Sequence, residues 1–127
     1  MTLVRPALIA LAAVIAAPAA AQAAPVNPAA GKLVFMRCAA CHNAVKGQPN
    51  KIGPNLAGVV GRKSGTAPGF RYSAPFAKAN LTWNEATLDK WLTRPAALVP
   101  GTSMVFAGLP NPQDRANVIA YLKKPVP

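Results

Sequence analysis

The chain is short and strongly basic: its 127 residues include 14 Lys and Arg against 3 Asp and Glu, a formal net charge of +11. That length leaves room for one small domain and a leader segment. The sequence has one His and offers no carboxylate pair and no Ser/His arrangement, so we expect no enzyme that works by acid–base or nucleophilic catalysis.

The N-terminus has the pattern of a secretory signal peptide. Arg5 precedes an unbroken apolar run at 8–17, and Pro18 and an Ala-rich stretch follow it. The run is short for a membrane span, which needs ~20 residues. Ala21-Gln22-Ala23 is the best A-x-A cleavage site, and cleavage after Ala21 is the alternative. We expect residues 1–23 to be removed on export and residues 24–127 to form a periplasmic domain with no stable membrane insertion. The alternatives are a buried Ala-rich helix or a retained anchor.

A first helix is expected at about 28–37, and the most informative stretch of the chain follows it. Cys38-Ala39-Ala40-Cys41-His42 has the C-x-x-C-H spacing that attaches haem c. In that interpretation Cys38 and Cys41 form two thioethers to the haem, and His42 is an axial ligand of its iron. Both cysteines and the only His of the chain lie within these five residues.

Other interpretations of the motif explain less. A structural zinc site needs four ligands, and the chain has no second Cys pair and no second His. A thioredoxin-like dithiol needs a βαβ context, which the flanking sequence does not show. A plain disulfide fits an oxidising compartment but leaves the adjacent His42 without a role.

Two more helices and a coil with a methionine complete the chain. Thr82 opens a capping box ahead of a helix that ends at Pro95. Asn111 is the expected N-cap of the last helix, which runs to about Lys124. The coils at 43–81 and 95–110 are rich in Gly and Pro, and no strand is expected.

Met104, in the second coil, is the candidate for the other axial ligand. A thioether sulfur is soft and binds haem iron, and a His/Met pair raises the reduction potential. Met1 leaves with the signal peptide, and Met36 lies two residues from Cys38 on the same side of the ring as His42. A lone Met is usually core filler, but with haem attached Met104 becomes the expected ligand.

The chain resembles the class I cytochromes c, of the mitochondrial type and the bacterial c2 or c550 type. The resemblance covers nearly all of the mature domain and is carried by several blocks: residues 38–42, Gly53-Pro54-Asn55-Leu56, Gly61-Arg62-Lys63, Ala67-Pro68-Gly69-Phe70, Pro100-Gly101-Thr102 with Met104, and Phe106-Ala107-Gly108. It implies an all-α fold of about three main helices, with long loops wrapping one covalent haem, in which the first and last helices cross near Gly31, Phe35 and Tyr121.

The same resemblance implies roles for residues around the haem. The Pro54 carbonyl would accept the His42 ring N–H. Arg62, Tyr72 and Trp83 would hydrogen-bond the haem propionates, with Thr102 near them. Several positions depart from the family. Trp91 stands where a Tyr is usual near the Met sulfur, and Phe76 stands where an Asn is common. Asn50 replaces a loop His, and Ala96 and Ser103 occupy positions that are often Lys.

The function implied is that of an electron-transfer protein and not an enzyme, a periplasmic one-electron carrier. We expect a monomer whose Lys32, Arg37, Lys46, Lys51 and Arg94 surround the haem edge and steer it to acidic surfaces of redox proteins. These could be a bc1-type complex, a terminal oxidase, a reaction centre or a dehydrogenase. Such charge also suits nucleic acid, which the expected export argues against. Two alternatives remain open: a dedicated cytochrome subunit of a periplasmic dehydrogenase, and a gas-binding or peroxidatic haem protein.

Overall fold

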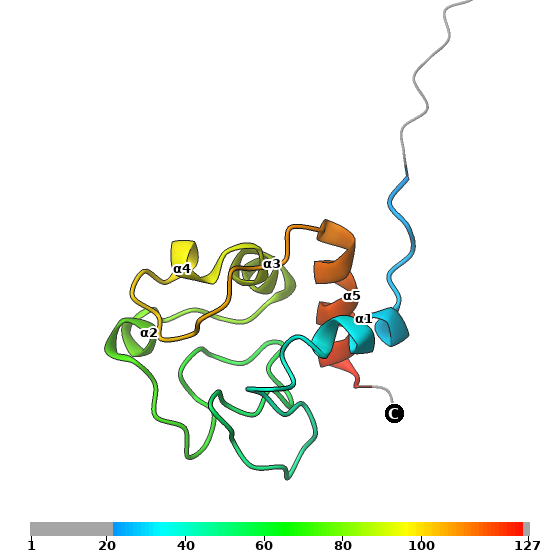
Figure 1. The fold of residues 1–127 in the computed structure, drawn as a ribbon. Helices are drawn as coiled ribbons and strands as arrows, with labels where there is room; N and C mark the ends of the chain where they lie inside the picture. The colour runs from blue at the N-terminus through cyan, green and yellow to red at the C-terminus, as the bar shows by residue number, and fades with distance from the viewer. Residues whose placement is uncertain (1–21, 126–127) are drawn as a thin grey trace, which may run out of the picture.

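The crossing of the first and last helices anchors the fold (Figure 1). The structure is a computed structural model that describes residues 22–125; nearly all of the expected signal peptide lies outside the described residues. Helix α1 spans Pro28–Phe35 and helix α5 spans Pro112–Lys123. A side chain at Gly31 would overlap the main-chain carbonyl of Asn117, so glycine permits the close approach.

Aromatic packing completes that crossing. The rings of Phe35 and Tyr121 lie 5.3 Å apart between centroids and are tilted by 46°. Both residues are buried, as are Val118, Ile119 and Leu122 of α5. The crossing that the resemblance implied, near Gly31, Phe35 and Tyr121, is therefore present.

Asparagine side chains cap all three of the longer helices. Asn27 accepts hydrogen bonds from the backbone N–H groups of Ala29 and Ala30 at the start of α1. Asn111 caps α5 as expected, with Pro112 in the first turn. The predicted cap of helix α3, Glu85–Thr93, is wrong by two residues. Asn84 accepts from Thr87 N, whereas Thr82 pairs with Lys63 in an isolated antiparallel bridge.

Two short helices lie in segments predicted as coil. Helix α2 spans Ala74–Lys78 and helix α4 spans Pro95–Leu98. Pro95, predicted to end the preceding helix, also begins the next one, because its fixed φ suits the first turn of a helix. Among residues 22–125 the isolated bridge is the only β pairing, so the all-α prediction is confirmed.

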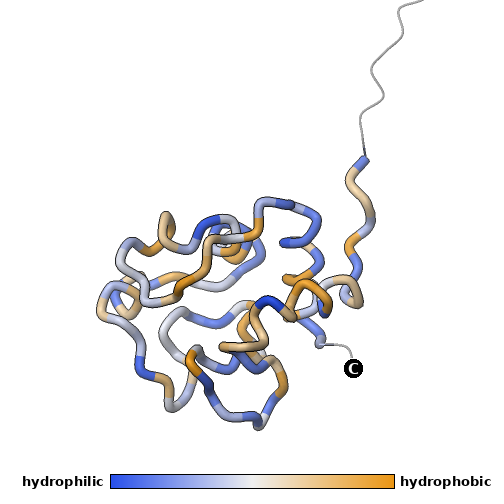
Figure 2. The backbone as a smooth tube through the Cα atoms, in the orientation of Figure 1, coloured by the Kyte–Doolittle hydropathy of each residue, from blue (hydrophilic) through white to orange (hydrophobic). Residues whose placement is uncertain are grey.

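The apolar core joins the helices to the loops. Its buried residues come from α1, α3, α5 and the long segments between them, and hydrophobic residues are spread along the whole tube in Figure 2. In the described residues no helix is long and apolar enough to cross a membrane. Loops supply much of the hydrophobic core, which is therefore built from segments that are separate in sequence.

Candidate functional site

One cavity gathers every site residue that the sequence predicted. Its wall comes from residues 37–62, from 70–76, from Trp83, from α3 and from 102–106. The predicted residues on it are Cys38, Cys41, His42, Pro54, Arg62, Tyr72, Trp83, Thr102 and Met104. These positions are up to 66 residues apart in sequence, so the fold, and not local sequence, brings them together.

The His42 ring has a defined orientation. Its Nδ1 lies 2.8 Å from the Pro54 carbonyl oxygen. A carbonyl only accepts, so Nδ1 carries the hydrogen and donates it, and Nε2 keeps a free lone pair. Burial lowers the pKa of His42, although the bond to Pro54 opposes that shift. The neutral imidazole that a metal ion requires is thus the favoured form.

The backbone around His42 is tightly bonded. Its own N–H donates to the Cys38 carbonyl at 2.9 Å, and Gly53 N donates to the Cys41 carbonyl at 2.8 Å. Gly53 packs so closely that a Cβ at this position would overlap the imidazole ring. The Gly-Pro pair at 53–54 therefore both makes room for the ring and supplies its hydrogen-bond acceptor.

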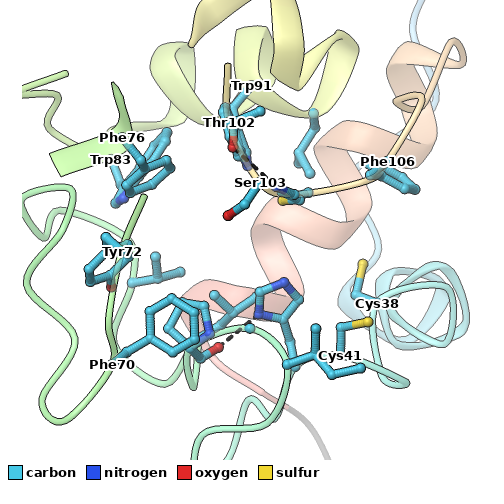
Figure 3. A pocket seen from close by; sticks show the side chains of 18 of the residues that line it. Cys38, Cys41, Phe70, Tyr72, Phe76, Trp83, Trp91, Thr102, Ser103 and Phe106 are labelled. Atoms are coloured by element: carbon cyan, nitrogen blue, oxygen red, sulfur yellow. Dashed lines mark hydrogen bonds between the residues drawn. The ribbon is translucent and has the colours of Figure 1, made fainter. Parts of the chain in front are cut away.

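Two cysteine sulfurs lie at one edge of the cavity. Cys38 and Cys41 are both free and half-buried. Figure 3 shows them on the side of the cavity opposite Tyr72 and Trp83. Burial raises the pKa of the Cys38 thiol, an effect that the neighbouring Arg37 charge opposes. The thiols are placed to bond covalently to a group that fills the cavity.

Met104 reaches the cavity from the loop between α4 and α5. It is half-buried and packs against the hydrophobic core, and its N–H donates to the Thr102 hydroxyl at 3.3 Å. Met36, by contrast, is 66% exposed and lies outside the cavity wall. Among the described residues, Met104 alone therefore brings a thioether sulfur to this cavity.

Hydrogen-bond donors gather elsewhere on the wall. Arg62 donates to the carbonyls of Ala57 and Asn55 at 3.1 and 3.4 Å, while its buried Nε has no partner. The Ser73 hydroxyl is also buried without a partner. The Tyr72 oxygen accepts from Ala67 N at 3.1 Å, which leaves its own O–H hydrogen to donate. Buried donors without partners are costly, so this region is suited to an acceptor from outside the chain.

Ser73 was not predicted from the sequence. It follows Tyr72 directly, in a coil where a Ser is an ordinary surface residue. Only its burial beside the cavity, with no hydrogen-bond partner, distinguishes it from the other serines. A polar residue next to a predicted Tyr contact was the one sequence feature that could have found it.

Aromatic rings form a continuous wall of the cavity. Phe76 is central: its ring stacks on Tyr72 at 5.1 Å and 8°, and meets Trp91 edge-on at 5.5 Å. Trp83 lies 6.0 Å from Phe76 and 5.5 Å from Trp91. Phe70 contacts Tyr72 at 4.8 Å. Phe76 and Trp91, two of the positions expected to depart from the family, thus pack against each other and make this wall apolar.

The predicted docking residues are all exposed, but their environments differ. Lys32, Arg37, Lys46, Lys51 and Arg94 each have exposed side chains. Arg37 lies at the rim of the cavity. The Lys51 ammonium donates to the Ala39 carbonyl at 2.6 Å, within the attachment motif, so part of its hydrogen-bonding capacity is already used.

The residues on the wall fit a haem. The cavity combines an apolar wall, two thiols at one edge, an imidazole lone pair, a thioether sulfur and unpaired donors that suit carboxylates. A zinc site does not fit, because it needs four ligands and residues 22–125 contain no group of three or more His, Cys, Asp or Glu side chains that could hold a metal ion.

Comparison with known proteins agrees with this fit. The family model described as Cytochrome c matches residues 28–124. Cytochrome c2 iso-2 of Magnetospirillum fulvum is 57% identical over 89 residues, covering 70% of this chain and 92% of that protein. Cytochrome c2 of Rhodoblastus acidophilus is 50% identical over 98 residues, covering 77% and 92%.

A solved structure is similar over the same region. Cytochrome cH from Methylobacterium extorquens superimposes with a TM-score of 0.73 at 46% identity, covering 76% of this chain and 97% of that one. The chain therefore belongs to the cytochrome c family, as a class I c-type cytochrome with one covalently bound haem c and the role of a monohaem electron carrier.

Proposed function

We propose that this protein is a periplasmic one-electron carrier whose iron is held by His42 and Met104. The observation that carries the proposal is that the free Nε2 lone pair of His42 and the Met104 sulfur belong to one cavity that also holds both attachment thiols. Cys38 and Cys41 would form the two thioethers. If His42 and Met104 both bind the iron, they would leave no position for oxygen or a substrate, which favours a carrier over an enzyme or a gas-binding protein.

The haem supplies an iron that cycles between the ferrous and ferric states. Around it, the chain holds Nε2 of His42 in place through the Pro54 carbonyl and presents a soft sulfur from Met104, which favours a positive potential. The aromatic wall would present an apolar surface to the haem, and Arg62, Tyr72, Ser73, Trp83 and Thr102 would donate to or lie beside the propionates.

The exposed basic residues support docking to acidic redox proteins. Eleven of the basic side chains in the described residues are exposed, and the acidic side chains Asp89 and Glu85 are paired with Arg115 and Lys123. The uncompensated charge is therefore positive and would speed association with acidic partners at low salt. A monomeric carrier of this kind would suit a bc1-type complex, a terminal oxidase, a reaction centre or a dehydrogenase as partner. Export to the periplasm would separate it from nucleic acid.

A visible absorption spectrum tests the ligand assignment. We expect sharp bands in the dithionite-reduced protein that survive acid–acetone extraction, because the haem is covalently attached. The ferric protein should show the weak far-red band of iron–methionine sulfur ligation. Covalent haem without that band would overturn the assignment of Met104, and carbon monoxide binding to the untreated ferrous protein would then favour the gas-binding alternative.

Export is tested by fractionation and mass spectrometry. We propose that residues 1–23 are a cleaved signal peptide and that residues 24–127 form the mature domain. The expected result is a haem-bearing protein in the periplasmic fraction, with the mass of a chain that starts at Ala24 and carries one haem. Recovery of the haem protein in the membrane fraction with residues 1–23 still attached would contradict it.

A further inference from the structure

The Met104 loop, residues 99–110, is tied at its far end by a single arginine on α5. We propose that Arg115, oriented by Asp89, is a positioning residue that holds the Met104 loop against α3 and so limits how often the Met104 sulfur leaves the iron. This inference rests on the proposed role of Met104 as an axial ligand. It concerns a residue outside the cavity wall, and none of the sequence patterns pointed to it.

The loop has few hydrogen bonds of its own. Thr102 N donates to the Val99 carbonyl at 3.1 Å, and Met104 N donates to the Thr102 hydroxyl at 3.3 Å. In the described part of the chain, the N–H groups of residues 105–108 donate to no protein acceptor. Val105 is fully exposed. The position of Met104 therefore depends on how the two ends of the loop are fixed.

Arg115 makes three hydrogen bonds, two to the far end of the loop and one to Asp89 on α3. Its Nη1 donates to the carbonyls of Leu109 and Pro110 at 2.8 and 3.0 Å, and its Nε donates to Asp89 Oδ1 at 2.6 Å. The Arg115 side chain is only 12% exposed. One rigid guanidinium thus joins α5, α3 and the end of the loop, and a Lys ammonium lacks the fork that makes these bonds together.

The loop end fits closely against α3 at the same place. Leu109 N donates to the Leu92 carbonyl at 2.7 Å, and Leu109 is 1% exposed. A side chain at Gly108 would overlap the Thr93 carbonyl. Leu92 itself lines the cavity. Because the contact is so close, loosening residues 109–110 would shift the chain that leads back to Met104.

A second ion pair provides an internal comparison. Glu85 and Lys123 also join α3 to α5, but their side chains are 62% and 47% exposed and make no bond to the Met104 loop. Removing this pair changes the link between the same two helices and leaves the loop contacts intact. Lys123→Gln is therefore the matched control for Arg115→Gln.

The test is the rate at which cyanide binds to the ferric protein, followed by the change in the haem absorption band. Cyanide enters only when Met104 leaves, so the rate reports opening of the loop. We expect Arg115→Gln to bind cyanide about tenfold faster or more, the change produced by 1.4 kcal/mol. Lys123→Gln should stay within about twofold of the wild type, since exposed pairs contribute little.

Arg115→Lys keeps the charge beside Asp89 but lacks the guanidinium fork, so its rate should lie between those of the wild type and Arg115→Gln. If Arg115→Gln does not fold, Arg115→Lys and Asp89→Asn decide the matter. Equal cyanide rates in the wild type, Arg115→Lys and Asp89→Asn, with the far-red band present, would overturn the inference. A wild-type protein without the far-red band would instead overturn Met104 as the ligand, so the two failures are distinguishable.

Discussion

The two sides of the haem site are held in different ways. On one side, His42 belongs to a segment fixed by neighbouring hydrogen bonds: His42 to Cys38, Gly53 to Cys41 and the imidazole to Pro54. On the other side, Met104 has one weak local hydrogen bond, at 3.3 Å, and depends on contacts at the ends of its loop.

The difference indicates where each proposed ligand would get its stability. His42 follows directly after the attachment cysteines, so covalent bonds and local backbone bonds would keep this proposed ligand near the iron even when the rest of the fold loosens. Met104 lies 62 positions further along the chain, and its position depends on the packing of α3 and α5. We therefore expect the methionine side to open first, and the following predictions test this comparison.

The largest expected effect is loss of the second ligand itself. Met104→Ala should abolish the far-red band, lower the reduction potential and let carbon monoxide bind the ferrous protein, because the soft sulfur is gone. Absorption spectra and a redox titration measure these changes. Met36→Ala is the control: Met36 is exposed and outside the cavity, so its removal should leave the band and the potential unchanged. A far-red band that persists in Met104→Ala would show that another residue binds the iron.

The packing around the His42 ring can be disturbed by adding a methyl group at Gly53. The added methyl in Gly53→Ala overlaps the His42 ring, so we expect it to lower the free energy of unfolding by about 3 kcal/mol. Guanidinium unfolding followed by tryptophan fluorescence measures this. The control is Gly47→Ala, where φ is +85° and no atom lies near the new Cβ; backbone strain alone should cost about 1 kcal/mol. Equal losses in both variants would mean that the ring is not tightly seated.

The next prediction concerns Ser73, whose buried hydroxyl lies beside the cavity. The sign of the stability change in Ser73→Ala shows whether this hydroxyl donates to a propionate. If Ser73 donates to a propionate, Ser73→Ala should lower the free energy of unfolding of the haem protein by about 1 kcal/mol. If it does not, removing a buried hydroxyl without a partner should leave stability unchanged or raise it. Ser103→Ala, at an exposed hydroxyl, should be neutral. Thermal or guanidinium unfolding of the haem-loaded proteins measures both.

The sequence predicted the parts of the fold that depend on local chemistry. The Asn111-Pro112 start of α5 and Pro95 at the end of α3 are local signals, and α5 begins and α3 ends where expected. The cap of α3 was misplaced because Thr82 has the capping-box pattern, yet its backbone pairs with Lys63, a partner distant in sequence. Helix α2 was missed because its five residues carry no helical periodicity; its Phe76 joins the aromatic wall through tertiary contacts.

The candidate site divides in the same way. The motif at 38–42 is continuous in sequence and could be interpreted directly, whereas the expected propionate contacts came only from resemblance to a family. Neither route found Ser73 or Arg115, because what distinguishes them is burial and the partners they have or lack in the folded chain.

The smallest expected effect concerns the charge at the rim, beside the attachment motif. Arg37→Glu should slow electron transfer to an acidic partner several-fold at low ionic strength, because Arg37 lies at the cavity edge where docking would occur. Lys124→Glu makes the same charge change on an exposed residue outside the cavity wall, so it controls for net charge alone. Stopped-flow rates should differ between the two variants near 10 mM salt and converge near 1 M, where screening shortens to about 3 Å. Equal slowing by both would mean that total charge, and not the rim beside Cys38, guides the encounter.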